Sequence, residues 1–238
     1  MIFSMFFLPF KVFSTWNRLV FELVIFKVYS ANLTDVTVLY INIFGGLKMD
    51  TSDYFQNLSK ILKVDRKQIS YVSGLILECT TNNNTMWIFG NGGSASTAEH
   101  FETDLSFVRH DIGDLKIKAF ALTCNSALIT AIGNDIGFEN IFSHQLIRKA
   151  TKGDLCMVIS ASGNSLNLIK AVDVAKQMGL KTIGLLGFDG GELAGQVDFS
   201  IIVKTEIGKY GPVEDAHLAI CHAISQELLN HLNTTDVT

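Results

Sequence analysis

Short apolar runs alternate with longer amphipathic stretches along most of the chain. Between residues 52 and 79, apolar side chains recur at helical spacing, which predicts one or two amphipathic helices. A polar break at 80–85 follows, and then the first of five apolar runs, each of a length typical of a buried strand. These runs are 86–89, 118–122, 155–159, 182–186 and 199–203.

Helical patterns fill several of the intervening segments. Leu166, Ile169 and Val172 share one face of a helix that closes at Gly179, and the tail from about 213 to 232 is strongly helical in pattern. Strands that alternate with helices predict a parallel sheet covered on both faces. Ligands of such sheets bind outside the carboxyl ends of the strands, so a site is expected in the loops that follow the apolar runs.

Residues 1–48 differ from the rest of the chain, because Phe, Ile, Val and Leu dominate them. A signal peptide does not fit, since no positive residue precedes the apolar run and no clear small-residue cleavage site follows it. A transmembrane helix does not fit either, since charged residues interrupt every window before it reaches roughly 18 apolar residues. The interrupting residues are Lys11, Arg18, Glu22 and Lys27.

A normally mixed sequence begins at Met49. We therefore expect translation to start there, with 1–48 as an apolar extension outside a domain that spans 49–238. A membrane-associated leader is the alternative explanation of the first 48 residues.

Composition limits the class of protein. Apolar residues make up 48% of the 238 and charged residues 18%, so a large buried core is expected. Two prolines and the lack of any repeat argue against disorder and against a repeat array. The net charge is −4 and the basic residues are scattered, so the chain lacks the basic face typical of nucleic-acid binding.

The four cysteines contain no CxxC pair. They are Cys79, Cys124, Cys156 and Cys221. We expect buried free thiols in a reducing compartment, which fits a cytoplasmic enzyme with no membrane partner for the domain.

The first apolar run ends in a glycine-rich loop, Gly90 to Ser96, and a helical pattern begins at once. Glycines let the backbone approach an anion closely, and the free N–H groups at a helix start favour negative charge. The loop is not a dinucleotide-binding motif, because Ala95 takes the place of its third glycine, and it has no P-loop lysine. A purely structural turn is the alternative explanation.

The third apolar run ends in a serine-rich loop that again enters a helix. Its three hydroxyls, from Ser160, Ser162 and Ser165, form a neutral cradle suited to a phosphate monoester. Serine is also a common helix cap, so one of the three is expected to be structural.

Three motifs in this order, GNGGSA, TAIGNDIGFENIF and ISASGNS, resemble those of the sugar isomerase (SIS) domain family and, within it, of the phosphoheptose isomerases. The resemblance covers about residues 50–232. It implies an α/β fold with a Rossmann-like, five-stranded parallel sheet flanked by helices. It also implies a homotetramer with active sites at subunit interfaces.

The resemblance also assigns substrate contacts. They are Asn91, Gly92, Gly93 and Ser94 in the first motif, Asn134 and Asp135 in the second, and Ser160, Ala161, Ser162 and Ser165 in the phosphate loop. Where this chain has Ala161 the family usually has Thr, and the missing hydroxyl removes a hydrogen bond worth about 0.5–1.5 kcal/mol.

Aldose–ketose isomerisation moves a proton between adjacent carbons through an enediol, so it needs a base, an acid and often a metal. His100 and Asp104 lie four residues apart after the glycine loop and share a helix face, although an ordinary surface pair is the alternative reading. The last helix offers further groups, and spacing alone does not say which converge. They are Glu214, Asp215, His217 and His222.

The resemblance selects four ligands for a zinc ion, namely His100, Asp104, Glu214 and His222, with Asp104 as base and His222 as acid. Two of them depart from the family, which has Glu at 104 and Gln at 214. The shorter Asp withdraws a base by about 1 Å, a displacement that can cost ~10²-fold in rate. The added charge of Glu214 favours a divalent cation. The two changes can form a compensated pair, in which Glu214 and not Asp104 is the base.

The other histidines and acidic residues considered are not expected to take part in catalysis or metal binding. We interpret His110, His144 and His231 as surface or core histidines. A solvated face is expected for Glu99, Glu102 and Asp111.

The sequence thus predicts a metal-dependent isomerase. Its substrate is expected to be a ketose phosphate, with conversion of sedoheptulose 7-phosphate to D-glycero-D-manno-heptose 7-phosphate for cell-surface heptose as the leading hypothesis. The alternative is a non-catalytic SIS-domain module that senses a sugar phosphate or binds a protein such as a replication initiator.

Overall fold

The computed structural model describes residues 51–106 and 116–235, with side chains from 52 onward and up to 230. The expectations for residues 1–48, His110, Asp111 and the side chain of His231 lie outside this part of the chain.

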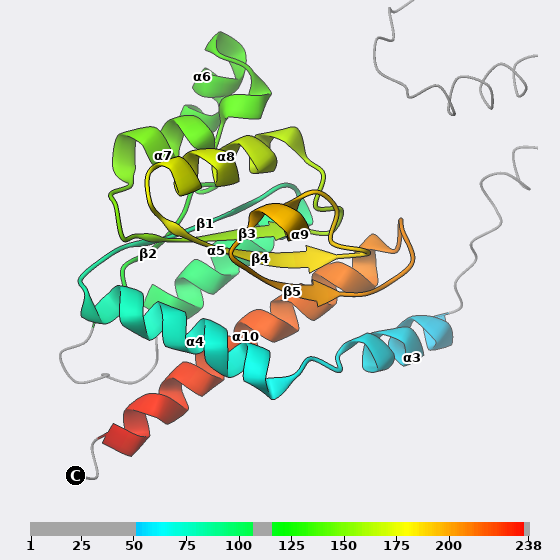
Figure 1. Ribbon diagram of the computed structural model, residues 1–238. Helices are drawn as coiled ribbons and strands as arrows, with labels where there is room; N and C mark the ends of the chain where they lie inside the picture. Colours follow the sequence, from blue (N-terminus) through cyan, green and yellow to red (C-terminus); the bar gives the residue numbers. More distant parts are fainter. Residues whose placement is uncertain (1–50, 107–115, 236–238) are drawn as a thin grey trace, which may run out of the picture. The chain divides into compact units, whose positions relative to one another are not determined.

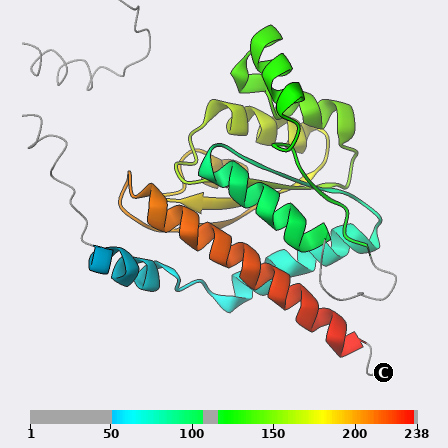
Figure 2. The same ribbon diagram turned by 180° about the vertical axis from the view of Figure 1, so that it is seen from behind.

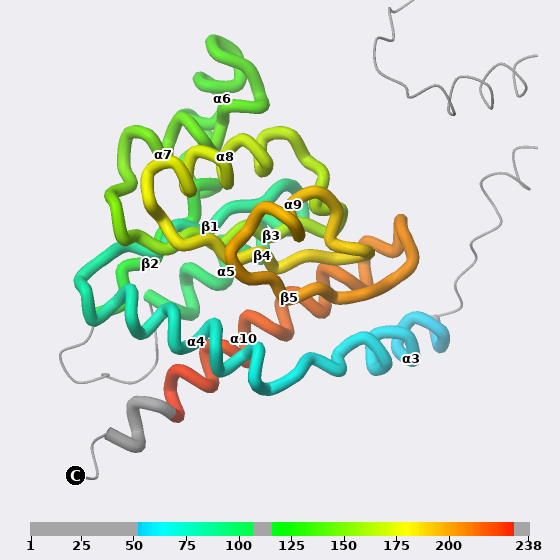
Figure 3. Tube along the Cα trace, viewed as in Figure 1, coloured from blue at the N-terminus to red at the C-terminus, as the bar shows by residue number. Residues whose placement is uncertain are grey.

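The described residues contain a five-stranded, fully parallel sheet in the order β2-β1-β3-β4-β5 (Figure 1). Its strands are β1 (Met86–Gly90), β2 (Ala119–Ala121), β3 (Leu155–Ser160), β4 (Lys181–Gly187) and β5 (Phe199–Val203). All five predicted strands are confirmed. The chain runs from β1 outward to β2 and then returns past β1 to β3, a path that Figure 3 traces. The direction of winding therefore switches between β1 and β3, where α/β sheets bind ligands.

Helices cover both faces of the sheet. One face carries α4 (Arg66–Thr81), α5 (Gly93–Ser106) and α10 (Tyr210–Thr235), and α3 (Thr51–Ile61) precedes them. The other face carries α7 (Ser143–Lys149), α8 (Leu166–Gln177) and the short α9 (Leu193–Gln196), with α6 (Ser126–Asp135) and the 3-10 turn η1 (Phe138–Asn140) beside them.

The segment 52–79 forms two helices because Asp65 caps the second one. The Asp65 carboxylate accepts a hydrogen bond from the Lys67 N–H, which satisfies one of the free donors at the start of α4.

The central strands alternate their side chains between two apolar cores. In β1, Met86 and Ile88 enter the core under α4, α5 and α10, whereas Trp87 and Phe89 enter the core under α7 and α8. Because both faces are buried, β1 and β3 are almost entirely apolar and show no alternation of polar and apolar residues.

The expectation of buried thiols is correct for Cys79, Cys156 and Cys221 and wrong for Cys124, which is exposed. Cys124 lies in the turn after β2 and not within a strand or helix that packs against the sheet.

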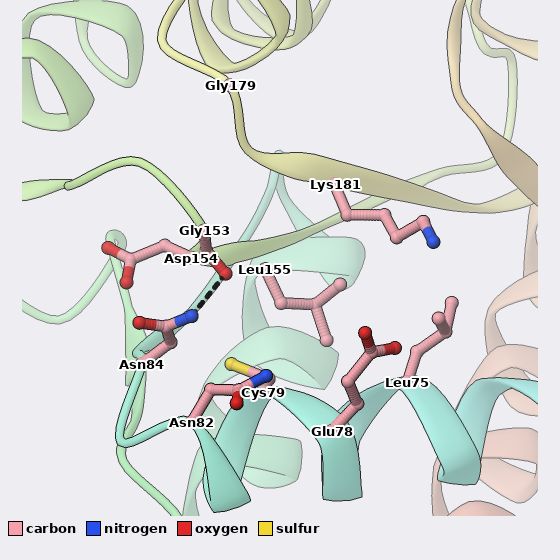
Figure 4. Close-up of a pocket in the computed structure, with 10 residues that line it drawn as sticks. All are labelled: Leu75, Glu78, Cys79, Asn82, Asn84, Gly153, Asp154, Leu155, Gly179 and Lys181. Carbon is pink, nitrogen blue, oxygen red and sulfur yellow. Dashed lines mark hydrogen bonds between the residues drawn. The ribbon is translucent and has the colours of Figure 1, made fainter.

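The amino-terminal edge of the sheet is closed by polar contacts within the chain. The buried Asp154 carboxylate accepts from the Thr85 N–H, the Trp87 indole and the Thr151 N–H, and so ties β1 to β3. A pocket of about 240 Å³ lies at this edge, where the Asn84 amide donates to the Gly153 carbonyl (Figure 4). This pocket is at the opposite end of the strands from the predicted substrate loops.

Among the described helices, none combines the length and the apolar character required to cross a membrane.

Candidate active site

The glycine loop starts where β1 ends against β3. A Cβ atom on Gly90 would lie 2.7 Å from the Ile159 carbonyl oxygen and 2.8 Å from the Ser94 Cβ, so only glycine lets β1 end this close to β3 and α5. Gly92 has a φ of +55°, a conformation that glycine adopts without strain. The Ser94 N–H donates to the Asn91 carbonyl, and the buried Ser94 side chain lies in the first turn of α5.

The serine loop, residues 160–165, begins on the neighbouring strand and is held by its own hydroxyls. The buried Ser160 Oγ accepts from the Gly163 N–H at 3.0 Å, and the Ser162 Oγ accepts from the Asn164 N–H at 3.3 Å. Ser165 occupies the N-cap of α8, but its hydroxyl makes no capping hydrogen bond. The expected serine cap is therefore not formed by a hydroxyl. Ser160 and Ser162 take the structural role, whereas the hydroxyl of Ser165 stays available to a ligand.

Ala161 lies in a small apolar cluster with Phe188 and Val213. Its methyl group is buried, and a Cβ on Gly187 would come within 3.1 Å of the Ala161 Cα. The position assigned to a missing hydroxyl is therefore part of the packing between the serine loop, the end of β4 and the first turn of α10.

Two polar contacts lock the loops together. The side-chain amides of Asn91 and Asn167 donate to each other, at 2.9 and 2.8 Å. The loop after β4 supports the serine loop from the other side, because the Glu192 N–H donates to the Asn164 side chain. Asn167 is not among the residues that the sequence predicts for the site. Its signal is an amide buried within the apolar face that opens α8.

His100, Asp104 and His222 converge although 122 residues separate the two histidines. The two Nε2 atoms lie 3.1 Å apart, and each lies 3.7 Å from an oxygen of the Asp104 carboxylate. The side chains of His100 and His222 are about half exposed, and that of Asp104 is one-quarter exposed. They meet because α5 and α10 run side by side on one face of the sheet (Figure 2).

The chemistry of these three residues fits a divalent cation. The Asp104 Oδ2 atom is buried and, within the described residues, accepts no hydrogen bond. A buried carboxylate oxygen without a donor is costly, and a metal ion is one of the groups that satisfies it. Two imidazoles and a carboxylate are also a donor set that zinc accepts.

Glu214 lies apart from this group. Its carboxylate covers the first turn of α5, where its oxygens lie 2.3 and 2.7 Å from the position that a Cβ of Gly93 would occupy. Seven residues separate Gly93 from His100, and eight separate Glu214 from His222, which correspond to roughly 10–12 Å along each helix. The glycine loop and Glu214 form one part of the site, and the His100/Asp104/His222 group forms another.

Asn134 and Asp135 lie at the end of α6 and are exposed. The Asn134 amide donates to the Asp135 carboxylate, and α6 is the part of its layer farthest from the sheet in both ribbon views (Figures 1 and 2). Within the described chain, no hydrogen bond or ion pair connects either residue to the two loops.

Glu99 is exposed as expected, but the solvated face predicted for Glu102 is wrong. The Glu102 carboxylate accepts from the Ala121 N–H at 2.7 Å and contacts the Cys124 sulfur at 3.4 Å, because it faces the end of β2. Partial burial and this carboxylate raise the pKa of Cys124 to about 11. His144 lies half-buried on α7.

Comparison with known proteins agrees with this architecture. The SIS domain family model matches residues 52–187. The phosphoheptose isomerase of Aliarcobacter butzleri is 35% identical over 178 residues, which cover 75% of this chain and 93% of that protein. That of Trichlorobacter lovleyi is 42% identical over 149 residues, covering 63% and 74%.

The fold of the chain is also similar to that of a solved phosphoheptose isomerase structure. The phosphoheptose isomerase of Neisseria gonorrhoeae superposes with a TM-score of 0.67 at 29% identity, covering 75% of this chain and 94% of that one. The predicted fold and family are therefore confirmed. The chain belongs to the SIS domain family and, within it, to the phosphoheptose isomerases.

Proposed function

We propose that the protein is an isomerase that converts sedoheptulose 7-phosphate to D-glycero-D-manno-heptose 7-phosphate. The observation that carries the proposal is the convergence of His100, Asp104 and His222 between α10 and α5, the helix that begins at the glycine loop. The names of the phosphoheptose isomerases to which the chain is related support the choice of substrate class.

The serine loop is the proposed phosphate site. It lies at the carboxyl edge of the sheet, and the hydroxyl of Ser165 at the start of α8 has no intrahelical partner. Ser160 and Ser162 hold the shape of the loop through their bonds to Gly163 and Asn164. A preformed neutral cradle binds a dianion with little reorganisation, and the start of α8 adds the favourable end of a helix dipole.

Asn91, Gly92, Gly93 and Ser94 are the proposed contacts of the sugar chain. The Asn91–Asn167 pair fixes this loop beside the phosphate site, so the two ends of a sugar phosphate can be held at once. Such positioning of the reacting carbons contributes a large part of the rate of an enzyme.

His100, Asp104 and His222 are the proposed ligands of a zinc ion, with Glu214 as a candidate fourth ligand. A zinc ion held by these residues would supply Lewis-acid polarisation of the substrate carbonyl. The carboxylate of Asp104 or of Glu214 removes a proton from C1 of the ketose and returns it to C2. His222, about half exposed beside Asp104, transfers the proton between the two oxygens of the enediol.

Asn134 and Asp135 are proposed to act in a neighbouring subunit of a homotetramer. The proposal is supported by their exposure and by the exposed apolar side chains of Ile136 and Phe138 beside them. An assembly that covers this segment would bring the two polar residues to another chain's loops.

A non-catalytic sugar-phosphate sensor is the second candidate. The position of Glu214 away from the His100/Asp104/His222 group favours it, because one of the four residues expected to act together does not join the other three. Such a protein would keep both substrate loops and bind its ligand without turnover.

The test measures metal content and isomerisation of sedoheptulose 7-phosphate by the chain that starts at Met49. About one zinc per chain, with turnover that a chelator abolishes and zinc restores, is the expected result. Asp104→Asn should lose zinc and activity together. Glu214→Ala tests ligation, because loss of zinc in this variant marks Glu214 as a ligand. Glu214→Gln keeps a ligand oxygen and removes only the basic carboxylate, so loss of turnover with zinc retained marks Glu214 as the base. Tight binding of the sugar phosphate with neither metal nor turnover would establish the sensor.

A further inference from the structure

His217 is a fully buried polar side chain that neither the substrate loops nor the His100/Asp104/His222 group uses. Its relative exposure is 0%, and among the described residues neither ring nitrogen has a hydrogen-bond partner. An apolar side chain of similar size would fill this position without the cost of two desolvated nitrogens. Retaining an imidazole here therefore suggests that its nitrogens have a use other than packing.

The ring lies directly behind the serine loop. It faces the Leu186 carbonyl without reaching hydrogen-bond geometry, and Leu186 pairs in the sheet with Ser160, the first residue of that loop. One turn earlier on α10, Val213 packs against Ala161. The first two turns of α10 thus support the point where β3 and β4 end.

The same part of α10 also carries Glu214, three residues before His217 and therefore on a neighbouring part of the helix surface. The Glu214 carboxylate covers Gly93 at the start of α5. His217 consequently lies in the helix segment that connects the serine loop to the glycine loop.

We propose that His217 is a positioning residue, which as a neutral imidazole hydrogen-bonds through a buried water molecule to the backbone where β3 and β4 end. A buried water molecule satisfies two to four polar groups, and the two ring nitrogens and the Leu186 carbonyl are such groups. The hydrogen bonds fix α10, and with it Glu214, relative to the serine loop. The role rests on the proposed binding of a sugar phosphate at that loop.

The experiment compares His217→Leu and His217→Gln in the full chain. Binding of sedoheptulose 7-phosphate is measured by calorimetry, together with KM, kcat and the melting temperature. His217→Leu should bind the sugar phosphate roughly 3- to 10-fold more weakly, with KM rising in proportion and kcat falling less. Its melting temperature should fall by roughly 2–4 °C, because the hydrogen bonds of the ring are lost and the backbone carbonyl that they reach is left without them. His217→Gln keeps a donor and an acceptor and should recover part of the affinity.

The opposite pattern would overturn the proposal. If His217 only fills space, His217→Leu will keep the affinity and KM of the wild type. His144→Leu, the same change on α7, is the control and should leave both values unaltered. Should His217→Leu not fold, His217→Met and His217→Gln form a second pair, and equal affinity of these two contradicts the role. Absence of wild-type turnover refutes only the enzymatic function, because calorimetry still tests His217, whereas absence of wild-type binding refutes both.

Discussion

At the scale of single residues, the site depends on polar atoms that are removed from water. Asp104 Oδ2 and both nitrogens of His217 are buried and have no partner in the described part of the chain. Asp104 has two histidines within 4 Å, whereas the group that His217 is known to face is the Leu186 backbone carbonyl. The first arrangement suits a cation, and the second suits a neutral ring.

The burial of His217 predicts a loss of stability in acid. Burial lowers the pKa of this ring from its ordinary 6.5 to about 4. As the pH falls from about 6.5 to about 4, the unfolded chain takes up a proton that the folded chain does not, so the free energy of unfolding decreases by about 3 kcal/mol. Urea unfolding at pH 7 and pH 4.5 should show that His217→Leu gains about 2–3 kcal/mol relative to the wild type at the lower pH. An identical pH dependence of the two proteins would contradict a buried, neutral His217.

Replacement of Gly93 by alanine is expected to lower turnover while leaving the free energy of unfolding almost unchanged. The Cβ of an alanine at this position would lie within 2.7 Å of the whole Glu214 carboxylate, so the carboxylate must move. The end of a flexible side chain moves at little cost, and we expect Gly93→Ala to change the free energy of unfolding by less than about 1 kcal/mol while turnover falls ~10-fold or more. Gly74→Ala is the matched control, because nothing lies within 4 Å of its added Cβ. Full turnover in Gly93→Ala would show that the position of Glu214 is not important.

At the scale of elements, the site is formed by segments that are distant in sequence. The serine loop of β3 is supported by the loop after β4, since Gly163 has a φ of +65° and its carbonyl accepts from the Leu193 N–H at 3.0 Å. Helix α3 is fixed to the second turn of α10 by Tyr54, whose hydroxyl donates to the Asp215 carboxylate.

Gly163→Ala should disrupt the serine loop. The new Cβ would lie 2.0 Å from the Gly190 carbonyl oxygen, and the backbone conformation itself is strained for alanine. We expect a decrease in the free energy of unfolding of more than about 2 kcal/mol, measured by urea unfolding, with a loss of sugar-phosphate binding. Gly133→Ala in α6, where the nearest atom is 3.9 Å from the added Cβ, should be tolerated.

The contact of Tyr54 with Asp215 is expected to make the protein less stable at alkaline pH. Burial, then the hydrogen bond to Asp215, raise the pKa of Tyr54 from 10 to about 12. The stabilisation by this phenol is therefore fully present below pH 10 and disappears as the pH rises towards 12. Tyr54→Phe should lose about 0.5–1.5 kcal/mol at pH 8, measured by urea unfolding, and less relative to the wild type at pH 11. A constant difference between the two proteins would argue against the Asp215 contact.

Elements were predictable from the sequence where local pattern determines them. The five strands are short apolar runs, and α4, α8 and α10 carry long periodic faces. The short elements α7, α9 and η1 were not predicted, because three to seven residues give little periodicity. The partners of Glu102 and Asn167 were missed for another reason. They are tertiary contacts with the end of β2 and with the glycine loop, and no local pattern contains them.

The candidate site likewise combines residues that a local pattern brings together with one that only tertiary packing brings to them. Position on a helix places His100 and Asp104 on one face, but only the packing of α5 beside α10 brings His222 to them. The resemblance to the SIS family supplied that pairing. The roles of these residues, and of Glu214, remain predictions.

At the scale of the whole molecule, residues 52–238 form a compact unit of their own. Both apolar cores described above consist of residues from 58 onward. A chain that starts at Met49 should therefore fold and unfold cooperatively, as judged by circular dichroism and thermal melting. Failure of the shorter chain to fold would assign a structural role to residues 1–48. Intact-mass analysis of protein made from the native gene tests the start site separately, and a mass that includes residue 1 would exclude initiation at Met49.

The Asn91–Asn167 pair also bears on how the protein ages in storage. An asparagine followed by glycine is prone to deamidation, because the next backbone nitrogen attacks the side-chain carbonyl, and Asn91 precedes Gly92. Here the amide is held by two hydrogen bonds to Asn167, which oppose the rotation that this attack requires. Once Asn91 becomes aspartate, the donor to Asn167 Oδ1 is gone and an acceptor faces an acceptor. Chemical damage at this one position would therefore release the glycine loop from the serine loop, and aged protein would lose ligand affinity before it lost its fold.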